Sequence, residues 1–223
     1  MVQDITLRYR FYKESNIIDS AIKFWDLIHS SLNIQFDSVH IVHKNKIIDP
    51  LSQKRALILK LIEEETNLDF MNKQTNEGFL IDKDQKKHNS IIFSILVNKV
   101  TPSWIDFFKK TMMTLGEAYV AQGVDSEISS RSSRPYNKLR RSIGLSFEPE
   151  YLHWLNYFNQ ETMQKYGGEA LYDLPHLTKA EPLGEGIFIQ IGESPEDRLQ
   201  PGGEERLFEA TKAMWELIKT NTQ

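Results

Sequence analysis

The sequence predicts an α+β protein with a mostly antiparallel sheet and helices packed chiefly on one face. Short segments in which apolar and polar residues alternate are typical of half-buried strands. Between them lie longer segments whose apolar residues recur every three or four positions, as in amphipathic helices. Two pairs of strands are close enough in sequence to form hairpins, at 79–97 and 178–191. Helices gathered on one face of a sheet would bury all the apolar stripes together.

The first half of the chain alternates between these two patterns. Ile5, Leu7 and Tyr9 predict a strand, and Ser15 or Asn16 predicts the cap of a helix that follows. The apolar stripe of that helix is expected to contain Ile18, Ala21, Ile22, Trp25, Ile28 and Leu32. A short strand at 39–43 precedes a second helix that starts near Pro50, and three carboxylates at 63–65 oppose the dipole at its end. A central strand ends the hairpin at 79–97, and a helix from Pro102 to Gly116 and a strand at 117–122 follow.

The second half begins with a polar, Ser-rich segment at 125–142, expected to be a seam or mobile loop within one domain that spans residues 1–223. Residues 152–158 suit either a strand or a short helix. A helix at 160–166 is expected to stop at Gly167, where a left-handed cap favours glycine. The second hairpin turns at Gly184, and a final amphipathic helix follows Gly202 and Gly203.

Composition excludes several classes of protein. The chain has 223 residues, 40% of them hydrophobic, and no cysteine, which excludes disulfides and thiolate zinc sites. The first residues lack the apolar run of a signal peptide, and no apolar run approaches the roughly 20 residues of a membrane span. We therefore expect a cytoplasmic protein with no membrane partner.

Charge is distributed unevenly along the chain, whose net charge is −4. Residues 1–120 contain sixteen basic and fifteen acidic side chains, against eleven and sixteen in residues 121–223. The acidic part is either a solvated surface or a face that steers a basic partner.

Known catalytic patterns are absent from the sequence. It contains no G-x-S-x-G elbow, Walker motif or dinucleotide-binding glycine pattern. His40 and His43, the closest histidine pair, would point to opposite faces of a strand. We expect no enzyme, no cofactor and no metal. The alternative is an enzyme of unrecognised class that uses Asp125 or His153 at a strand end.

One basic cluster, residues 131–141, offers a different alternative. It contains Arg131, Arg134, Lys138, Arg140 and Arg141 with Tyr136 between them, as in some modules that bind nucleic acid. The acidic balance of the remaining chain favours a solvated linker, so nucleic acid is not the partner that we expect.

Several short motifs resemble bacterial immunity proteins, which are encoded beside polymorphic and type VI secreted toxins. They are Trp154–Phe158, Tyr166–Gly168, Leu174-Pro175 and Gly186–Pro195 before a closing helix, with Tyr9–Tyr12, Gly78-Phe79, Pro102–Trp104 and Glu117–Ala121 in the front half. The order is similar to that of the Immunity protein 52 family, and also to that of the type VI immunity proteins of the related uncharacterised-domain class. The resemblance implies a protein that binds its cognate toxin in the cytosol and blocks the active site, and it implies no catalytic residues.

Loop carboxylates are the candidate contacts with such a toxin, because the active sites of many nucleases are basic. We select Asp125, Glu127, Glu193, Glu196 and Asp197 for their charge and expected exposure. The sequence leaves the oligomeric state open.

Overall fold

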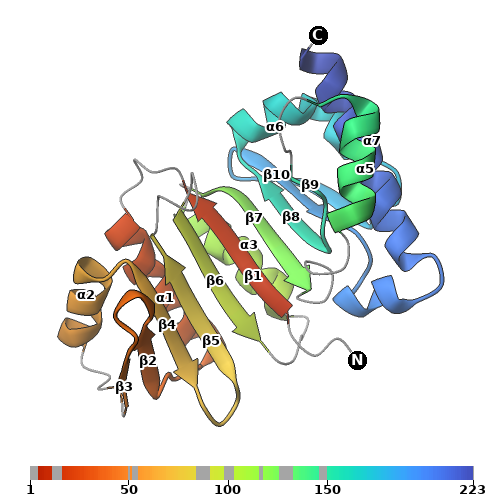
Figure 1. Cartoon of the computed structure of the whole chain (residues 1–223). Helices are drawn as coiled ribbons and strands as arrows, with labels where there is room; N and C mark the ends of the chain where they lie inside the picture. Colours follow the sequence, from red (N-terminus) through yellow and green to blue (C-terminus); the bar gives the residue numbers. More distant parts are fainter. Residues whose placement is uncertain are drawn as a thin grey trace. The chain divides into compact units, whose positions relative to one another are not determined.

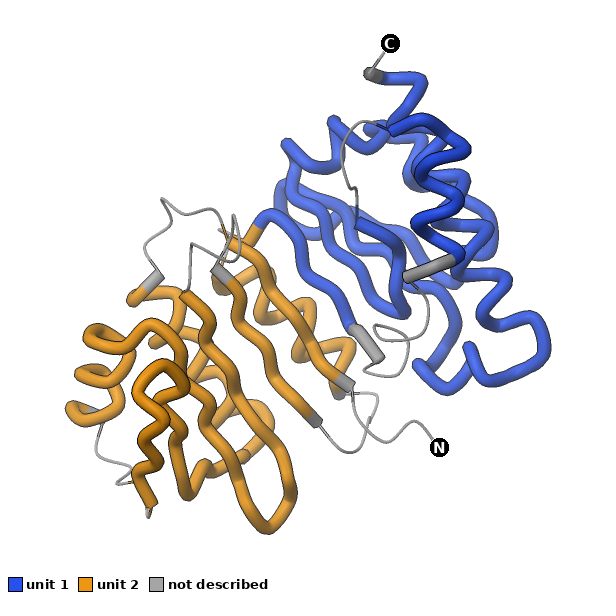
Figure 2. The backbone as a smooth tube through the Cα atoms, viewed as in Figure 1, with its two compact units in different colours: residues 1–3, 119–223 blue, residues 4–118 orange. Residues whose placement is uncertain are grey.

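A computed structural model describes residues 5–11, 17–49, 51, 55–83, 91–97, 103–115, 118–125, 133–145 and 150–222 (Figure 1). The chain forms two compact units, one of residues 4–118 and one of residues 1–3 and 119–223 (Figure 2). Each unit combines helices with antiparallel strands. The predicted α+β class is therefore confirmed, whereas the single domain spanning 1–223 stays a prediction.

The unit of residues 4–118 contains six strands in the order β3-β2-β4-β5-β6-β1. The strands are β1 (Ile5–Phe11), β2 (Ser38–Ile41), β3 (Lys46–Ile48), β4 (Asn67–Asn72), β5 (Glu77–Asp82) and β6 (Ile91–Val97), and the helices are α1 (Ile17–Leu32), α2 (Arg55–Glu64) and α3 (Ser103–Leu115). In Figure 1, α1 and α3 lie together behind these strands.

Aromatic rings fill the core of this unit. Alternate residues of each strand point toward the helices, so that Tyr9, Phe70, Phe79 and Phe93 are fully buried. Phe24 from α1 sits among them, with ring centroids 4.9–5.8 Å from Tyr9, Phe79 and Phe93. The alternate set of residues, on the opposite face of the sheet, is more polar and includes Arg8, Asp69 and Ser94.

The second unit contains four strands in the order β7-β8-β10-β9. The strands are β7 (Ala118–Asp125), β8 (Leu155–Phe158), β9 (Lys179–Leu183) and β10 (Gly186–Gln190), with helices α5 (Ser133–Ile143), α6 (Gln160–Tyr166) and α7 (Gly203–Thr222) and 3-10 turns η2 (Gly168–Asp173) and η3 (Pro195–Leu199). Val120, Phe158 and Ile187 are paired in register and join one core with residues of α5, α6 and α7.

Most elements lie where the sequence places them, including both hairpins and the helix at 160–166. Ile18 differs from expectation: it is exposed, and Phe24 and Leu27 are buried in α1 instead. Strands β3 and β4 were not expected. Within the polar segment at 125–142, residues from 133 onward form α5, because Tyr136, Leu139 and Ile143 align on one buried face.

The second helix ends at Glu64, and the next residue, Glu65, turns into the protein. Its carboxylate accepts a hydrogen bond from Lys44 Nζ at 2.7 Å and lies 3.1 Å from His43 Nε2. The hydrogen bond from Lys44 is the main cause that lowers the pKa of Glu65. The expected clash of carboxylates with the helix dipole is thus relieved for Glu65 by ion pairing outside the helix.

Candidate partner-binding loop

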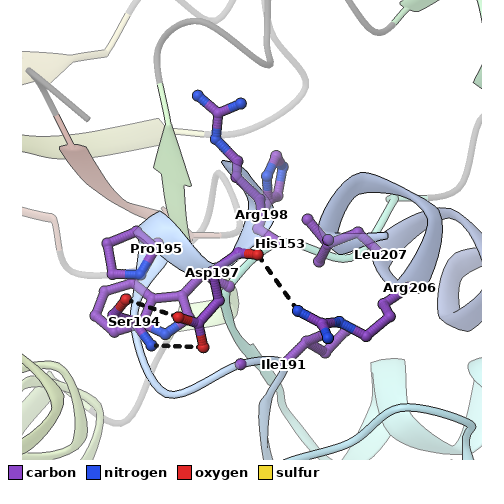
Figure 3. A pocket seen from close by; sticks show the side chains of 12 residues that line it. His153, Ile191, Ser194, Pro195, Asp197, Arg198, Arg206 and Leu207 are labelled. Carbon is purple, nitrogen blue, oxygen red and sulfur yellow. Dashed lines mark hydrogen bonds between the residues drawn. The ribbon is translucent and has the colours of Figure 1, made fainter. Parts of the chain in front are cut away.

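The segment between β10 and α7, residues 191–202, is a loop whose shape is fixed by its own polar groups. The Asp197 carboxylate accepts hydrogen bonds from the Glu193 backbone at 2.7 Å, and from the backbone and hydroxyl of Ser194. With Ser194 it forms a capping box at the start of η3. Figure 3 shows the two bonds from Ser194 and the hydrogen bond from Arg206 to the Asp197 carbonyl.

Two glycines let the loop fold tightly. Gly192 has a φ of +83°, and a Cβ atom there would lie 3.0 Å from the Asp197 carboxylate. A Cβ atom at Gly203 would approach the Arg198 Cα to 2.5 Å and the Asp197 carbonyl more closely still. The backbone therefore closes on itself in a way that only glycine permits at position 203.

A small cavity of about 20 Å³ lies beneath this loop and has room for about one water molecule. Its lining combines apolar side chains, such as Ile191 and Leu207, with His153 and the two arginines Arg198 and Arg206. Arg198 is buried, and its guanidinium lies 3.4 Å from the exposed carboxylate of Glu204. The cavity is too small for a substrate of ordinary size.

The exposed side chains of the loop are mostly acidic, and they flank one exposed apolar residue in the sequence. That residue is Leu199, which is 49% exposed. The exposed residues near Leu199 in the sequence are Glu193, Glu196, Gln200, Pro201, Glu204 and Glu205. We call this set of residues, 193–205, the acidic loop.

The five carboxylates selected from the sequence have different surroundings. Glu193 and Glu196 are exposed on the acidic loop, whereas Asp197 is half-buried and holds the capping box. The side chain of Asp125 and the whole of Glu127 lie outside the described residues. The proposed contact role of all five stays a prediction. Leu199, which is exposed, was not identified from the sequence. Nor was Arg198, which is buried although arginine usually lies at the surface.

Of the residues of the two alternative functions, His153 and Tyr136 are buried, whereas Lys138 and Arg141 are exposed. His153 is buried, its backbone N–H donates to the Asn156 side chain at 2.8 Å, and its ring packs on Tyr151. Tyr136 is buried too and stacks on Tyr151, with ring centroids 4.8 Å apart. Burial raises the pKa of Tyr136 to about 12. This ring is not available to stack on a nucleic-acid base.

The structure also bears on metal binding and on insertion into a membrane. Among the described residues, no group of three or more His, Asp or Glu side chains is arranged to hold a metal ion. None of the described helices is both long and apolar enough to cross a bilayer.

Comparison with known proteins shows a likeness in three-dimensional structure. No family model matches the sequence, and a comparison with curated proteins found no match. Among solved structures, the Pseudomonas aeruginosa T6SS protein PA0821 is similar, with a TM-score of 0.54 and 12% identity. The alignment covers 98% of this chain and 73% of that one. At this identity the likeness concerns the fold, which this chain shares with a protein of the type VI secretion system.

Proposed function

We propose that the chain is an immunity protein that binds a cognate secreted toxin in the cytosol and blocks its active site. Two independent features support this proposal. The motifs of the second unit resemble immunity proteins, and the fold resembles that of a T6SS protein. The proposed activity is binding alone, without catalysis.

The acidic loop is the observation that carries the proposal. Its hydrogen bonds to Asp197 hold the backbone before any partner arrives, which lowers the entropic cost of binding. An exposed apolar residue surrounded by charged ones has the composition of an interface with an apolar centre and a polar rim. Four exposed glutamates, Glu193, Glu196, Glu204 and Glu205, would attract a basic toxin surface.

The alternative function, an enzyme, has less support at the cavity beneath this loop. His153 lies beside two arginines, yet the cavity that they line holds about one water molecule. A substrate would have to open the loop that Asp197 and Gly203 hold closed.

Co-purification tests the proposal directly. The tagged chain is expressed in its native host with its chromosomal neighbours, and the proteins retained after a high-salt wash are identified. We expect one secreted protein that is toxic when it is expressed without this chain. A chain that retains no such protein contradicts the proposed function.

Loop variants then test the contact surface. Glu193→Lys with Glu196→Lys, and separately Leu199→Asp, should each weaken toxin binding at least about tenfold, or about 1.4 kcal/mol. The matched control is Glu169→Lys with Asp173→Lys, two exposed carboxylates of the same unit outside the acidic loop. Equal affinity of the loop and control variants would place the interface elsewhere.

A further inference from the structure

A groove of about 380 Å³ crosses the more polar face of the first unit's sheet. Figure 1 shows α1 and α3 on the other face of these strands. It is formed by side chains from four adjacent strands, β4, β5, β6 and β1. Asp69 on β4 lies at one end, and Arg8 on β1 lies at the other. The volume is within the range of sites that hold small ligands or several side chains of a partner.

Two of the residues that line the groove are small. Gly78 and Ser94 form part of its floor, and Met71, Leu80 and Leu96 contribute apolar surface beside them. A Cβ atom at Gly78 would lie 2.8 Å from the Met71 sulfur and 3.8 Å from Asp69 Oδ1. The Asp69 carboxylate therefore extends over Gly78, toward the floor of the groove.

The charge of Asp69 is only partly compensated. Among the residues that the structure describes, none donates a hydrogen bond to its carboxylate. Burial raises the pKa of Asp69, while the His40 ring on the neighbouring strand acts in the opposite direction. A half-buried carboxylate without a hydrogen-bond donor is stabilised by a cation that binds beside it.

We propose that this groove binds an arginine or lysine side chain presented by an extended segment of a partner protein. The cationic group pairs with Asp69, and its aliphatic stem packs on Met71, Leu80 and Leu96. Because Gly78 has no side chain, the aliphatic stem of the partner residue can lie beside the Asp69 carboxylate.

The length of the groove favours a protein segment over a small cation. Asp69 and Arg8 are three strand spacings apart, or about 14 Å at roughly 4.8 Å per spacing. An extended chain covers that distance in about four residues at roughly 3.3 Å per residue. The segment would therefore span the four strands that line the groove, with its cationic residue at the Asp69 end.

This inference goes beyond the proposed function, because it concerns the other unit and assigns no toxin to the groove. A peptide tests it without any toxin, so its failure is separate from a failure of the immunity proposal. The probe is an acetylated and amidated peptide of sequence Gly-Arg-Ala-Val-Ala-Glu-Gly, titrated into the full chain at up to millimolar concentration. Amide NMR shifts report where it binds.

We expect saturable shifts at Gly78, Leu80 and Ser94 with the arginine peptide. Citrulline in place of arginine preserves the shape and removes the charge, so it should weaken binding at least about tenfold. Asp69→Asn should weaken binding of the arginine peptide similarly, whereas Asp106→Asn, an exposed carboxylate on α3, should leave it unchanged. Equal binding of both peptides, shifts outside the groove alone, or no binding at millimolar concentration would overturn the proposal.

Discussion

The strands of the two units differ in how many of their residues are buried. In the unit of residues 4–118, strands β4 and β5 alternate buried apolar residues with partly exposed ones, and the sheet has one core face. In the other unit, every residue of β8 and β10 is buried. The sheet of the first unit therefore keeps one more polar face, whereas these two strands of the second unit are buried on both faces.

The source of stability differs accordingly. Aromatic rings fill the space between helices and sheet in the first unit, so packing volume supports it. In the second unit, Gly186 and Gly203 permit backbone segments to approach closely. We therefore expect the first unit to be sensitive to loss of side-chain volume and the second to addition of a single methyl group.

Phe24→Ala should have the largest effect. The ring is fully buried among Tyr9, Phe79 and Phe93, and its removal should lower the free energy of unfolding by about 3–5 kcal/mol. Urea unfolding measures this loss. Ile47→Ala, a change of an exposed residue on β3, is the control and should stay within about 0.5 kcal/mol. Similar losses for the two variants would mean that the rings do not support this unit.

Gly186→Ala should follow, with a loss of about 3 kcal/mol. The added Cβ atom would lie 2.9 Å from the Tyr157 ring and closer still to the Phe158 carbonyl, on the strand that β10 pairs with. Gly202→Ala is the matched control, because nothing lies within 4 Å of its Cβ position and only its φ of +77° disfavours alanine. A loss at Gly186 no greater than at Gly202 would contradict the role of close approach.

The same contrast explains which elements the sequence predicts. Strict alternation in Ile5, Leu7 and Tyr9 identifies β1, whereas the aromatic-rich segment at 154–158 is compatible with a strand or a helix until its pairing with Ile187 is known. Helix α5 was missed because its polar surface dominates the composition of 125–142, although three apolar residues align on one side.

The candidate sites are harder to predict than the fold. Glu193 and Glu196 are identifiable by charge in a Gly- and Pro-rich loop, but the inward turn of Asp197 depends on the capping box. The groove at Asp69 requires knowledge of the strand order, since its residues come from strands distant in sequence. A lone Asp between Leu68 and Phe70 carries no signal of its own.

Asp197→Ala tests whether the second unit's loop is held by its cap. Loss of the carboxylate leaves the backbone N–H groups of Glu193 and Ser194 without their acceptor and should lower the free energy of unfolding by about 0.5–2 kcal/mol. Hydrogen exchange of these two amides should accelerate in the variant. Glu196→Ala, its exposed neighbour, is the control and should change neither quantity. Unchanged exchange in Asp197→Ala would show that the loop needs no cap.

Glu65→Gln should have the smallest effect and a particular pH dependence. The folded pKa of Glu65 lies below its unfolded value of about 4.5, chiefly because Lys44 donates a hydrogen bond to the carboxylate. The stabilisation is therefore present above pH 4.5 and is lost as the pH falls through the folded pKa. Because Lys44 is half exposed and water screens the pair, we expect a difference below about 1 kcal/mol at pH 7. Unfolding curves of wild type and variant should converge on acidification. A constant difference at all pH values would mean that Glu65 contributes through packing, which would make this corner of the first unit resemble its aromatic core.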